Sequence, residues 1–142
     1  ELITKALPTI EGEVNNILSQ LVDFQMVFEM DGKNINNFIV YDDDNIWPLE
    51  LSSGMERFIS SLAIRVGLIN VSNLPRSNFL AIDEGWGTMD SDNLNSVYSL
   101  FQYLKSQFQF TLIVSHIDSM RDAVDTLLEV KKEKGFSNII FD

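Results

Sequence analysis

Apolar side chains recur every three to four residues in two stretches of the chain, and this spacing predicts amphipathic helices. The first stretch is 9–21, and the second is 55–70, which corresponds to about four helical turns. Two further helices are predicted at 92–107 and at 118–124. Pro8 precedes the first stretch, where it suits either a first helical turn or a kink after a preceding helix.

Alternation of apolar and polar residues predicts a hairpin of two half-buried strands, 24–30 and 35–41, joined by a two-residue Asp-Gly turn. A second hairpin, 127–130 with 138–141, is predicted to close the chain. The connection inside this second hairpin is rich in lysine. We interpret it as a solvated hairpin tip rather than as a DNA-binding site.

Two short apolar runs predict buried strands of a parallel sheet. Residues 79–84, Phe-Leu-Ala-Ile-Asp-Glu, are apolar up to two carboxylates, as in a strand that is covered on both faces. Residues 111–115 form the second run, which ends at His116, the only histidine of the chain. Together with the predicted helices, these strands indicate an α/β fold with a mixed sheet and flanking helices.

The paired carboxylates Asp83 and Glu84 are candidate site residues, because chemistry in open α/β sheets gathers at the carboxyl ends of strands. One carboxylate would hold Mg²⁺, and the other would orient or deprotonate a water molecule. The alternative is a strand that simply enters a turn through Asp-Glu-Gly. Three adjacent aspartates at 42–44 are a second metal candidate, but a solvated turn fits that segment better.

Composition narrows the class of protein. The 142 residues are 45% hydrophobic and include no cysteine, which predicts one globular domain without disulfides and fits a reducing compartment. No apolar run is long enough to cross a bilayer, so no membrane partner is expected. The net charge of -11 argues against nucleic acid binding, unless a local patch or a basic partner chain supplies cations. Because the chain starts at Glu1 rather than Met, we expect a fragment of a longer protein.

Four segments, taken in order, resemble the C-terminal half of the ATPase head of SbcC-type double-strand-break-repair proteins, which are SMC-like members of the ABC ATPases. Residues 83–90, Asp-Glu-Gly-Trp-Gly-Thr-Met-Asp, resemble the Walker B strand end and D-loop of that group. The Gly-x-Gly-Thr form of this D-loop points to SMC-like heads rather than to transporters. Residues 113–116 resemble the H-loop, and 129–137 resemble the closing strands.

The remaining segment resembles the ABC signature, whose usual core is Ser-Gly-Gly followed by Gln or Glu. In the favoured register Ser53 and Gly54 match the first two positions and Glu56 matches the last. Met55 then stands where the second glycine is usual, which puts the close approach of a phosphate in question. A register one residue earlier would make Ser52 the signature serine. Ser53 at a helix start is also an ordinary cap, and a cap uses the same geometry as an anion site.

The resemblance implies a role for each matching residue. Asp83 would hold Mg²⁺, and Glu84 would act as the general base toward the attacking water. His116 would sense the γ-phosphate or that water. Asp90 would organise the D-loop across a dimer interface, unless it only caps the following helix. The segment from Ser53 to Glu56 would bind ATP that is held by a second head.

The phosphate-binding Walker A sequence is absent from these 142 residues. The resemblance places it in an N-terminal half, so we expect an ATPase only once that half completes the site, with ATP and Mg²⁺ as cofactors. Residues 1–22 would be a helix that continues from a coiled coil, and 23–142 would be the C-terminal lobe of a P-loop ABC-type head. The implied partners are the N-terminal half, a second head, an SbcD-like nuclease and double-stranded DNA. The implied location is intracellular, in cytoplasm, nucleoid or nucleus.

Two other functions stay open at this point. One is another SMC-like ATPase of chromosome maintenance or recombination. The other is an ATP-gated scaffold that engages a second head without hydrolysis, because its signature is degenerate. A test of nuclease binding distinguishes the chromosome-maintenance ATPase from an ATPase of DNA end processing. A phosphate-release assay distinguishes the non-hydrolysing scaffold from both ATPases.

Overall fold

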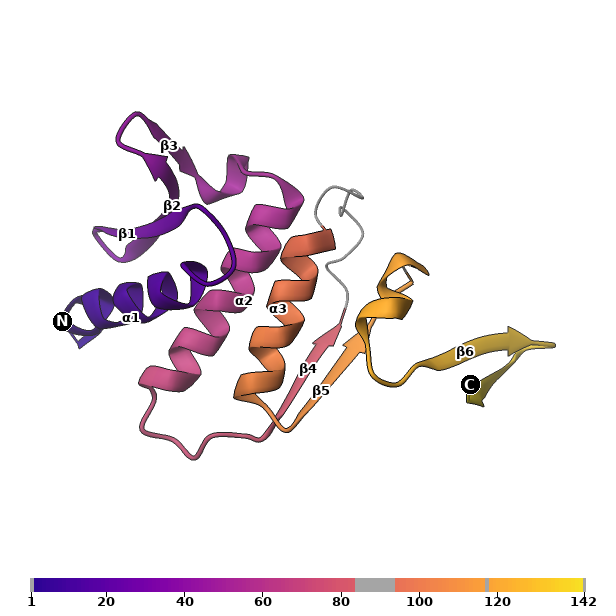
Figure 1. Ribbon diagram of the computed structural model, residues 1–142. Coiled ribbons are helices and arrows are strands. Elements are labelled where there is room, and N and C mark those ends of the chain that lie inside the picture. Colours follow the sequence, from indigo (N-terminus) through magenta and orange to yellow (C-terminus); the bar gives the residue numbers. More distant parts are fainter. Residues whose placement is uncertain (1, 84–93, 117, 142) are drawn as a thin grey trace.

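The computed structural model describes residues 2–83, 94–116 and 118–141 of the chain. Its architecture is mixed α/β, as predicted (Figure 1). In chain order the elements are α1 (Leu2–Leu18), β1 (Gln25–Asp31), β2 (Asn34–Asp42), β3 (Asn45–Pro48), the 3₁₀ helix η1 (Leu49–Leu51), α2 (Gly54–Val71), β4 (Phe79–Asp83), α3 (Leu94–Gln107), β5 (Phe110–Val114), the 3₁₀ helix η3 (Asp118–Ala123), β6 (Leu128–Glu133) and β7 (Phe136–Phe141).

The strands form three separate sheets within the described residues. Strands β1, β2 and β3 pair in that order and are antiparallel. Strands β4 and β5 pair in parallel, and β6 and β7 form an antiparallel ribbon. All of the predicted strands are confirmed. Strand β3 was not predicted, because its four residues are too few to show a clear alternation.

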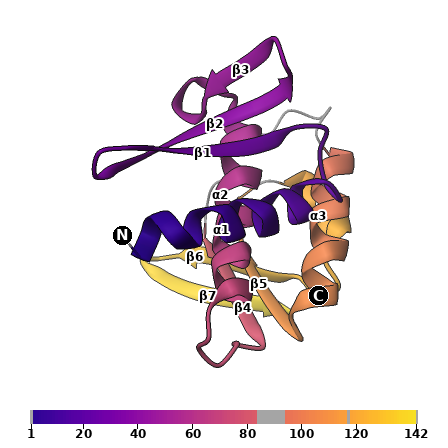
Figure 2. The same ribbon diagram turned by 90° about the vertical axis from the view of Figure 1, so that its left-hand side faces the viewer.

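Helix α2 is the centre of the hydrophobic core. Helix α1 and the sheet β1–β3 lie on one side of it, while α3 and the pair β4–β5 lie on the other (Figures 1 and 2). Helices α1 and α2 cross closely, because Gly67 of α2 has no side chain and Val14 of α1 fills the space in front of it. The largest side chains that are almost fully buried are Val14, Ile17, Leu18, Met26, Ile39, Ile59, Ser60, Val66, Val97, Leu100 and Leu104.

Side chains of α1 bind the free edge of strand β1. Asn15 makes a pair of hydrogen bonds with the backbone of Met26: its Nδ2 donates to the carbonyl oxygen at 2.8 Å, and its Oδ1 accepts from the N–H at 2.7 Å. The N–H of Phe28 donates to a carboxylate oxygen of Glu11 at 2.8 Å. An unpaired strand edge exposes such groups, so these contacts fix the sheet on the helix and cover its edge.

The first helix differs from its prediction in extent. It runs from Leu2 to Leu18 and contains Pro8, whereas the apolar pattern predicted 9–21. The chain leaves the helix after Leu18, and the N–H groups of Leu21 and Val22 both donate to the Leu18 carbonyl in a tight turn. That turn redirects the chain into β1, so tertiary packing decides where the helix ends.

The prediction that residues 79–84 are covered on both faces is wrong for the described part, β4. Leu80 and Ile82 face the core, but Phe79, Ala81 and Asp83 are exposed. Strand β5 repeats this pattern, with Phe110, Leu112 and Val114 exposed. The physical reason is that the described helices α2 and α3 cover only one face, and a parallel sheet needs a layer on each.

The ribbon β6–β7 also carries apolar side chains that the described residues leave open. Val130 and Ile139 are cross-strand partners on one face, and they keep 64% and 58% of their surface exposed. Figure 1 shows the ribbon projecting away from the helices. None of the helices in the described part of the chain combines the length and apolar character that crossing a membrane requires.

The crossing of α1 and α2 yields a prediction about stability. Gly67→Leu should lower the free energy of unfolding by about 1–3 kcal/mol, because a Cβ at this position already lies 3.0 Å from Val14 Cγ2. Denaturant unfolding measures the change. The matched control is Gly12→Ala on α1, where a Cβ meets nothing within 4 Å, and this variant should gain about 0.5–1 kcal/mol. Equal stability of the Gly67→Leu and wild-type chains would contradict the close crossing.

Candidate functional site

The N-terminus of α2 is formed by a capping box. Ser53 is the N-cap, and its Oγ accepts a hydrogen bond from the Glu56 N–H at 3.2 Å. In return the Ser53 N–H donates to Glu56 Oε2 at 2.6 Å. Two of the N–H groups at the helix start are thereby satisfied, and the backbone conformation of the segment is fixed. The cap function of Ser53 is confirmed, while phosphate binding by the same residue stays a prediction.

Ser52 has a different task from Ser53. Its N–H and its hydroxyl both donate to the carbonyl of Leu49, at 3.2 and 2.6 Å, and so close the turn η1. Ser53 is the exposed serine at the helix start. The two serines therefore have different structural roles, since Ser52 closes η1 and Ser53 begins α2; which of them is the signature serine stays a prediction.

Met55 is buried, with 6% of its surface exposed, and belongs to the hydrophobic core. Its side chain is thus not in the solvent in front of the helix. The Glu56 N–H is used by the cap, and the Arg57 N–H donates to the Ser53 carbonyl at 3.0 Å. The N–H groups of Gly54 and Met55 remain as the first-turn donors of α2.

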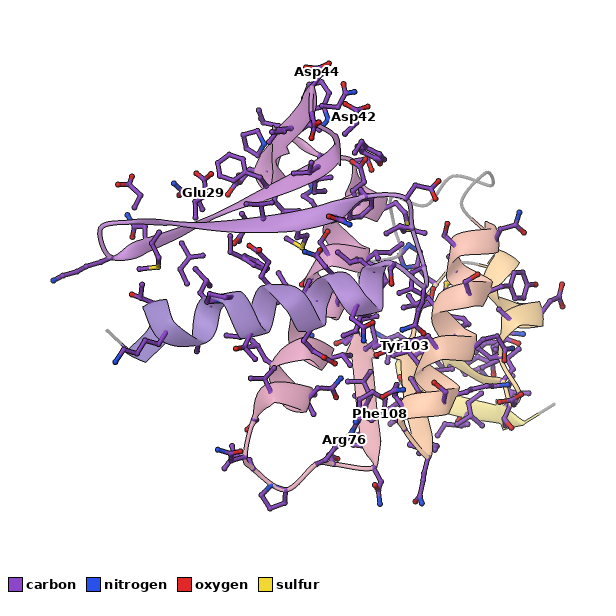
Figure 3. All side chains as sticks on the ribbon, turned by 60° about the vertical axis from the view of Figure 1, so that its left-hand side comes forward. Glu29, Asp42, Asp44, Arg76, Tyr103 and Phe108 are labelled. Carbon is purple, nitrogen blue, oxygen red and sulfur yellow. The ribbon has the colours of Figure 1, made fainter. Side chains whose placement is uncertain are left out.

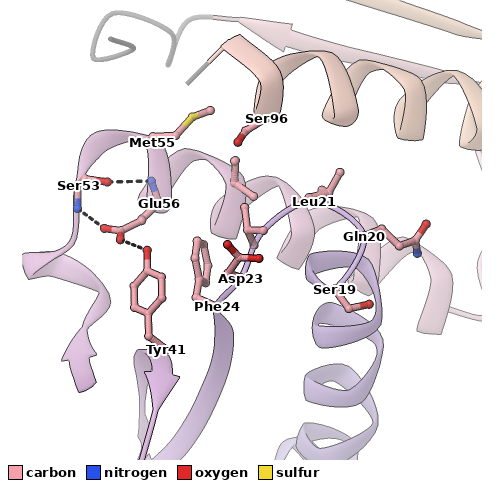
Figure 4. A pocket seen from close by; sticks show the side chains of 12 residues that line it. Ser19, Gln20, Leu21, Asp23, Phe24, Tyr41, Ser53, Met55, Glu56 and Ser96 are labelled. Carbon is pink, nitrogen blue, oxygen red and sulfur yellow. Dashed lines mark hydrogen bonds between the residues drawn. The ribbon is translucent and has the colours of Figure 1, made fainter. Parts of the chain in front are cut away.

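Tyr41, at the end of β2, adds a third hydrogen bond to this network. Its hydroxyl donates to Glu56 Oε1 at 2.5 Å, so each oxygen of the Glu56 carboxylate has its own donor (Figure 4). The Tyr41 ring also packs edge-on against Phe24, with ring centroids 5.6 Å apart. The sheet is connected in this way to the first turn of α2.

The network changes the acidity of both groups. Burial, the hydrogen bond to Glu56 and the nearby negative charges of Glu56 and Asp23 raise the pKa of Tyr41 to about 12. Burial by itself would raise the pKa of Glu56. The hydrogen bonds from Tyr41 and Ser53 outweigh it, so that the Glu56 pKa lies below its ordinary value. Glu56 is accordingly a carboxylate anion at neutral pH.

Asp83 and His116 lie at one edge of the β4–β5 pair. Asp83 is the last residue of β4 and is paired with Val114, the last residue of β5. His116 follows two positions later, and both Asp83 and His116 are exposed. The parallel pairing of β4 and β5 thus brings Asp83 and His116 to the same edge of the sheet, while their catalytic roles stay predictions. Glu84 and Asp90 lie outside the described residues.

The donor set at this edge suits Mg²⁺ only with help from other ligands. Within the described residues no three side chains of the types His, Cys, Asp and Glu are grouped so that they could hold a metal ion. Mg²⁺ in nucleotide sites is typically bound by one or two carboxylates, by phosphates and by water. A single exposed aspartate at a strand end fits that mode and does not fit a site built from protein ligands alone.

The acidic turn at 42–44 is a solvated turn, as the sequence favoured. Asp42 accepts hydrogen bonds from the Asp44 N–H at 3.0 Å and from Asn45 Nδ2 at 2.7 Å. The hydrogen bond from Asn45, followed by that from the Asp44 backbone, lowers the pKa of Asp42. The labelled side chains Asp42 and Asp44 lie at the tip of the hairpin (Figure 3). This turn joins β2 to β3.

A pocket of about 460 Å³ lies beside the capping box. It is lined by the turn between α1 and β1, by the start of α2 and by Ser96 of α3 (Figure 4). Asp23, Phe24 and Tyr41 line it, and none of these was identified from the sequence. The Ser-x-x-Glu spacing did contain the signal for the capping box, but no local pattern connects Tyr41 to a helix that starts more than ten residues later.

Comparison with known proteins supports an SMC-like head. The chain is 37% identical over 156 aligned residues to "Uncharacterized protein R555" of Acanthamoeba polyphaga mimivirus, covering 99% of this chain. It is 29% identical to the C component of the SbcCD nuclease of Staphylococcus aureus over 116 residues, or 79% of this chain. The chain spans only 12% and 11% of the lengths of these relatives. No protein-family model matches it.

Solved structures give the same fold. An SMC structure, from work on ATP-driven dimerization and DNA-stimulated activation of SMC ATPases, has a TM-score of 0.78. The match covers 99% of this chain and 87% of that one at 15% identity, so it shows a shared fold. The fold of the chain is that of an SMC ATPase head, and the resemblance to the C-terminal region of an SbcC-type, SMC-like head is confirmed.

The raised pKa of Tyr41 yields a prediction about alkaline pH. The folded-state pKa of about 12 exceeds the ordinary value of 10.0, so the hydroxyl contributes stability that is present below pH 10 and is lost as pH approaches 12. Phenolate absorbance should show a tyrosine that ionises near pH 12, and Tyr41→Phe should remove that step. Tyr98→Phe, at an exposed tyrosine of α3, is the control and should retain it. Removal of a step near pH 10 by Tyr41→Phe would contradict the assignment.

Proposed function

We propose that the chain is the C-terminal half of an ATP-hydrolysing SMC-like head, which dimerises around ATP and Mg²⁺ to drive DNA end processing with an SbcD-like nuclease. The observation that carries this proposal is the position of Asp83 and His116 at the ends of neighbouring parallel strands, within the fold of an SMC head. The resemblance to the C component of the SbcCD nuclease supports the assignment to DNA ends.

Each residue has a task in this proposal. Bound Mg²⁺ would neutralise the charge that develops on the phosphates of ATP. Asp83 would hold the ion, and Glu84 would act as the general base toward the attacking water. His116 contacts the γ-phosphate or that water from the end of β5. Asp90 organises the D-loop between two heads.

The start of α2 faces the ATP of a second head in this proposal. The Ser53 hydroxyl and the N–H groups of Gly54 and Met55 meet its γ-phosphate, since a helix N-terminus attracts anions through its dipole and its free donors. Glu56 acts indirectly, because its two carboxylate oxygens already bind Ser53 and Tyr41. Because both heads contribute to each site, engagement and hydrolysis are coupled.

The N-terminal half would bring the Walker A loop and complete the sheet. The exposed face of β4 and β5 is apolar, with Phe79 and Phe110 stacked at 5.7 Å between ring centroids. Parallel strands are normally covered on both faces, so this face suits a further protein layer. The open apolar face of β6–β7 suits the same partner. By itself the chain then has no complete ATP site and is inactive.

A second candidate is an SMC-like ATPase of chromosome maintenance or recombination, which the match to an SMC structure over nearly the whole chain favours. Binding of an SbcD-like nuclease to the assembled head separates the two. A third candidate, the scaffold that engages without hydrolysis, is separated by measuring phosphate release. In the first proposal, the further partner is double-stranded DNA inside the cell.

The split site yields a prediction for ATP binding. The isolated chain should bind ATP weakly or not at all in calorimetry, and addition of the N-terminal half should restore binding. Leu112→Asp on the exposed face of β5 should prevent restoration, because it puts a charge into the interface between the halves. The control is Leu74→Asp, at a loop leucine that is 77% exposed, and it should have no effect. Tight binding of ATP by the isolated chain would rule out the split site.

The signature register yields a second prediction, measured on assembled heads. Glu84→Gln should reduce hydrolysis by about 10²-fold or more and let ATP-bound dimers accumulate. In that background Ser53→Arg should abolish the dimer, because a bulky side chain fills the phosphate-facing helix start, while ATP binding to each head persists. Light scattering after size exclusion measures the dimer.

Ser52→Arg is the matched control for this experiment and should be milder. Loss of the dimer in Ser52→Arg alone would shift the register by one residue. Dimers that persist in both variants would mean that the start of α2 is only a cap.

A further inference from the structure

We propose that Tyr41 is a positioning residue for head engagement: through Glu56 it holds Ser53 in the conformation that faces the phosphate of the second head. This inference rests on the proposed function, since it assumes that Ser53 meets that phosphate. Tyr41 belongs to the sheet β1–β3 and not to the signature segment, from which the strand β3 and the turn η1 separate it in the chain.

The first step is the pair of hydrogen bonds between Glu56 and Ser53. The Glu56 carboxylate accepts the Ser53 N–H at 2.6 Å, and the Glu56 N–H binds the Ser53 hydroxyl at 3.2 Å. Ser53 therefore has its backbone and its side chain fixed by the same residue. The Ser53 hydroxyl oxygen accepts in this contact, so its own O–H can still donate to an anion while both contacts persist.

The second step is the hydrogen bond from Tyr41 to Glu56. Glu56 is only partly buried, and other rotamers would extend its carboxylate into the solvent at the helix start. The Tyr41 hydroxyl binds Oε1 at 2.5 Å and keeps the carboxylate folded back on the cap. Without that bond, the anion would be free to turn outward and repel a phosphate.

The third step is the rigidity of Tyr41 itself. Its ring packs edge-on against the buried Phe24, and its two neighbours in the chain are paired, Val40 with Gln25 of β1 and Asp42 with Asn45 of β3. Strand β1 is in turn bound by Asn15 and Glu11 of α1. These contacts fix the position of the Tyr41 hydroxyl relative to the rest of the lobe, as a positioning group requires. The raised pKa of Tyr41 agrees with a proton that is held in this bond at neutral pH.

The test uses heads assembled from this chain and the N-terminal half, in the Glu84→Gln background. Tyr41→Phe removes one hydroxyl and keeps the ring contact with Phe24. It should weaken ATP-dependent dimerisation by about 3- to 10-fold, less than the full contribution of a hydrogen bond to a charged group, because Tyr41 affects the dimer only through Glu56. Binding of ATP to the separate heads should not change. Tyr98→Phe, an exposed tyrosine on α3, is the control and should dimerise as the parent does.

A double-mutant cycle distinguishes positioning from a general loss of structure. In a Glu56→Ala background the Tyr41 hydroxyl has lost its acceptor, so adding Tyr41→Phe should cost no further dimerisation. Thermal melting of each variant shows that it is folded at the temperature of the assay. An equal effect of Tyr41→Phe with and without Glu56 would overturn the proposal, because it would show that Tyr41 acts through packing of the sheet.

The result for Ser53→Arg separates failure of this inference from failure of the proposed function. If Ser53→Arg abolishes dimers while Tyr41→Phe behaves like Tyr98→Phe, then the role of Tyr41 is refuted and the proposed function stands. If dimers persist in Ser53→Arg, then the phosphate-facing role of α2 is refuted, and this inference is refuted with it.

Discussion

The close packing of helix α2 between two layers is the constraint on which the rest of the lobe depends. Gly67 lets Val14 of α1 approach on one side, while Ile59 and Leu62 join the core that α2 shares with its neighbours. Because α2 is closely packed along several turns, it cannot rotate or slide without opening this core. The position of its first turn is therefore set by apolar contacts far from that turn. The hydrogen bonds of Ser53, Glu56 and Tyr41 then need to fix only the last few side-chain angles.

The two sides of α2 differ in how complete they are. Toward α1 and β1–β3, the core side chains Met26 and Ile39 are fully buried, and the edge of β1 is bound by Asn15 and Glu11. Toward β4 and β5 only one face of the parallel pair is covered by the described residues. Burial of apolar surface is the main driving force of folding, so the open faces of β4–β5 and β6–β7 represent stabilisation that a further layer would supply. Completing the ATP site and completing the core are, in this view, the same event.

Much of the fold was predictable because its signals are local. The stripe of α2, the alternation of β1 and β2, and the apolar runs of β4 and β5 each follow from the period of one element. The end of α1 and the open face of β4 were not predictable, because they depend on which other elements are present to pack against them. The same division holds at the site. The sequence pattern placed Asp83 and His116 at strand ends and Ser53 at a helix start, whereas Tyr41 reaches Glu56 only through the sheet and has no local signal.

The methionine in the signature segment changes the core more than it changes the helix start. Met55 is buried, so its side chain adds to the apolar contacts that hold α2, and a glycine there would leave a cavity. The N–H groups of Gly54 and Met55 point along the helix axis whatever side chain is attached, so the donors for a phosphate are kept. What the methionine alters is the clearance beside those donors, since its Cβ occupies space that glycine leaves empty. Fixing Ser53 and Glu56 through Tyr41 then matters more, because a tighter approach tolerates less movement of the side chains that surround it.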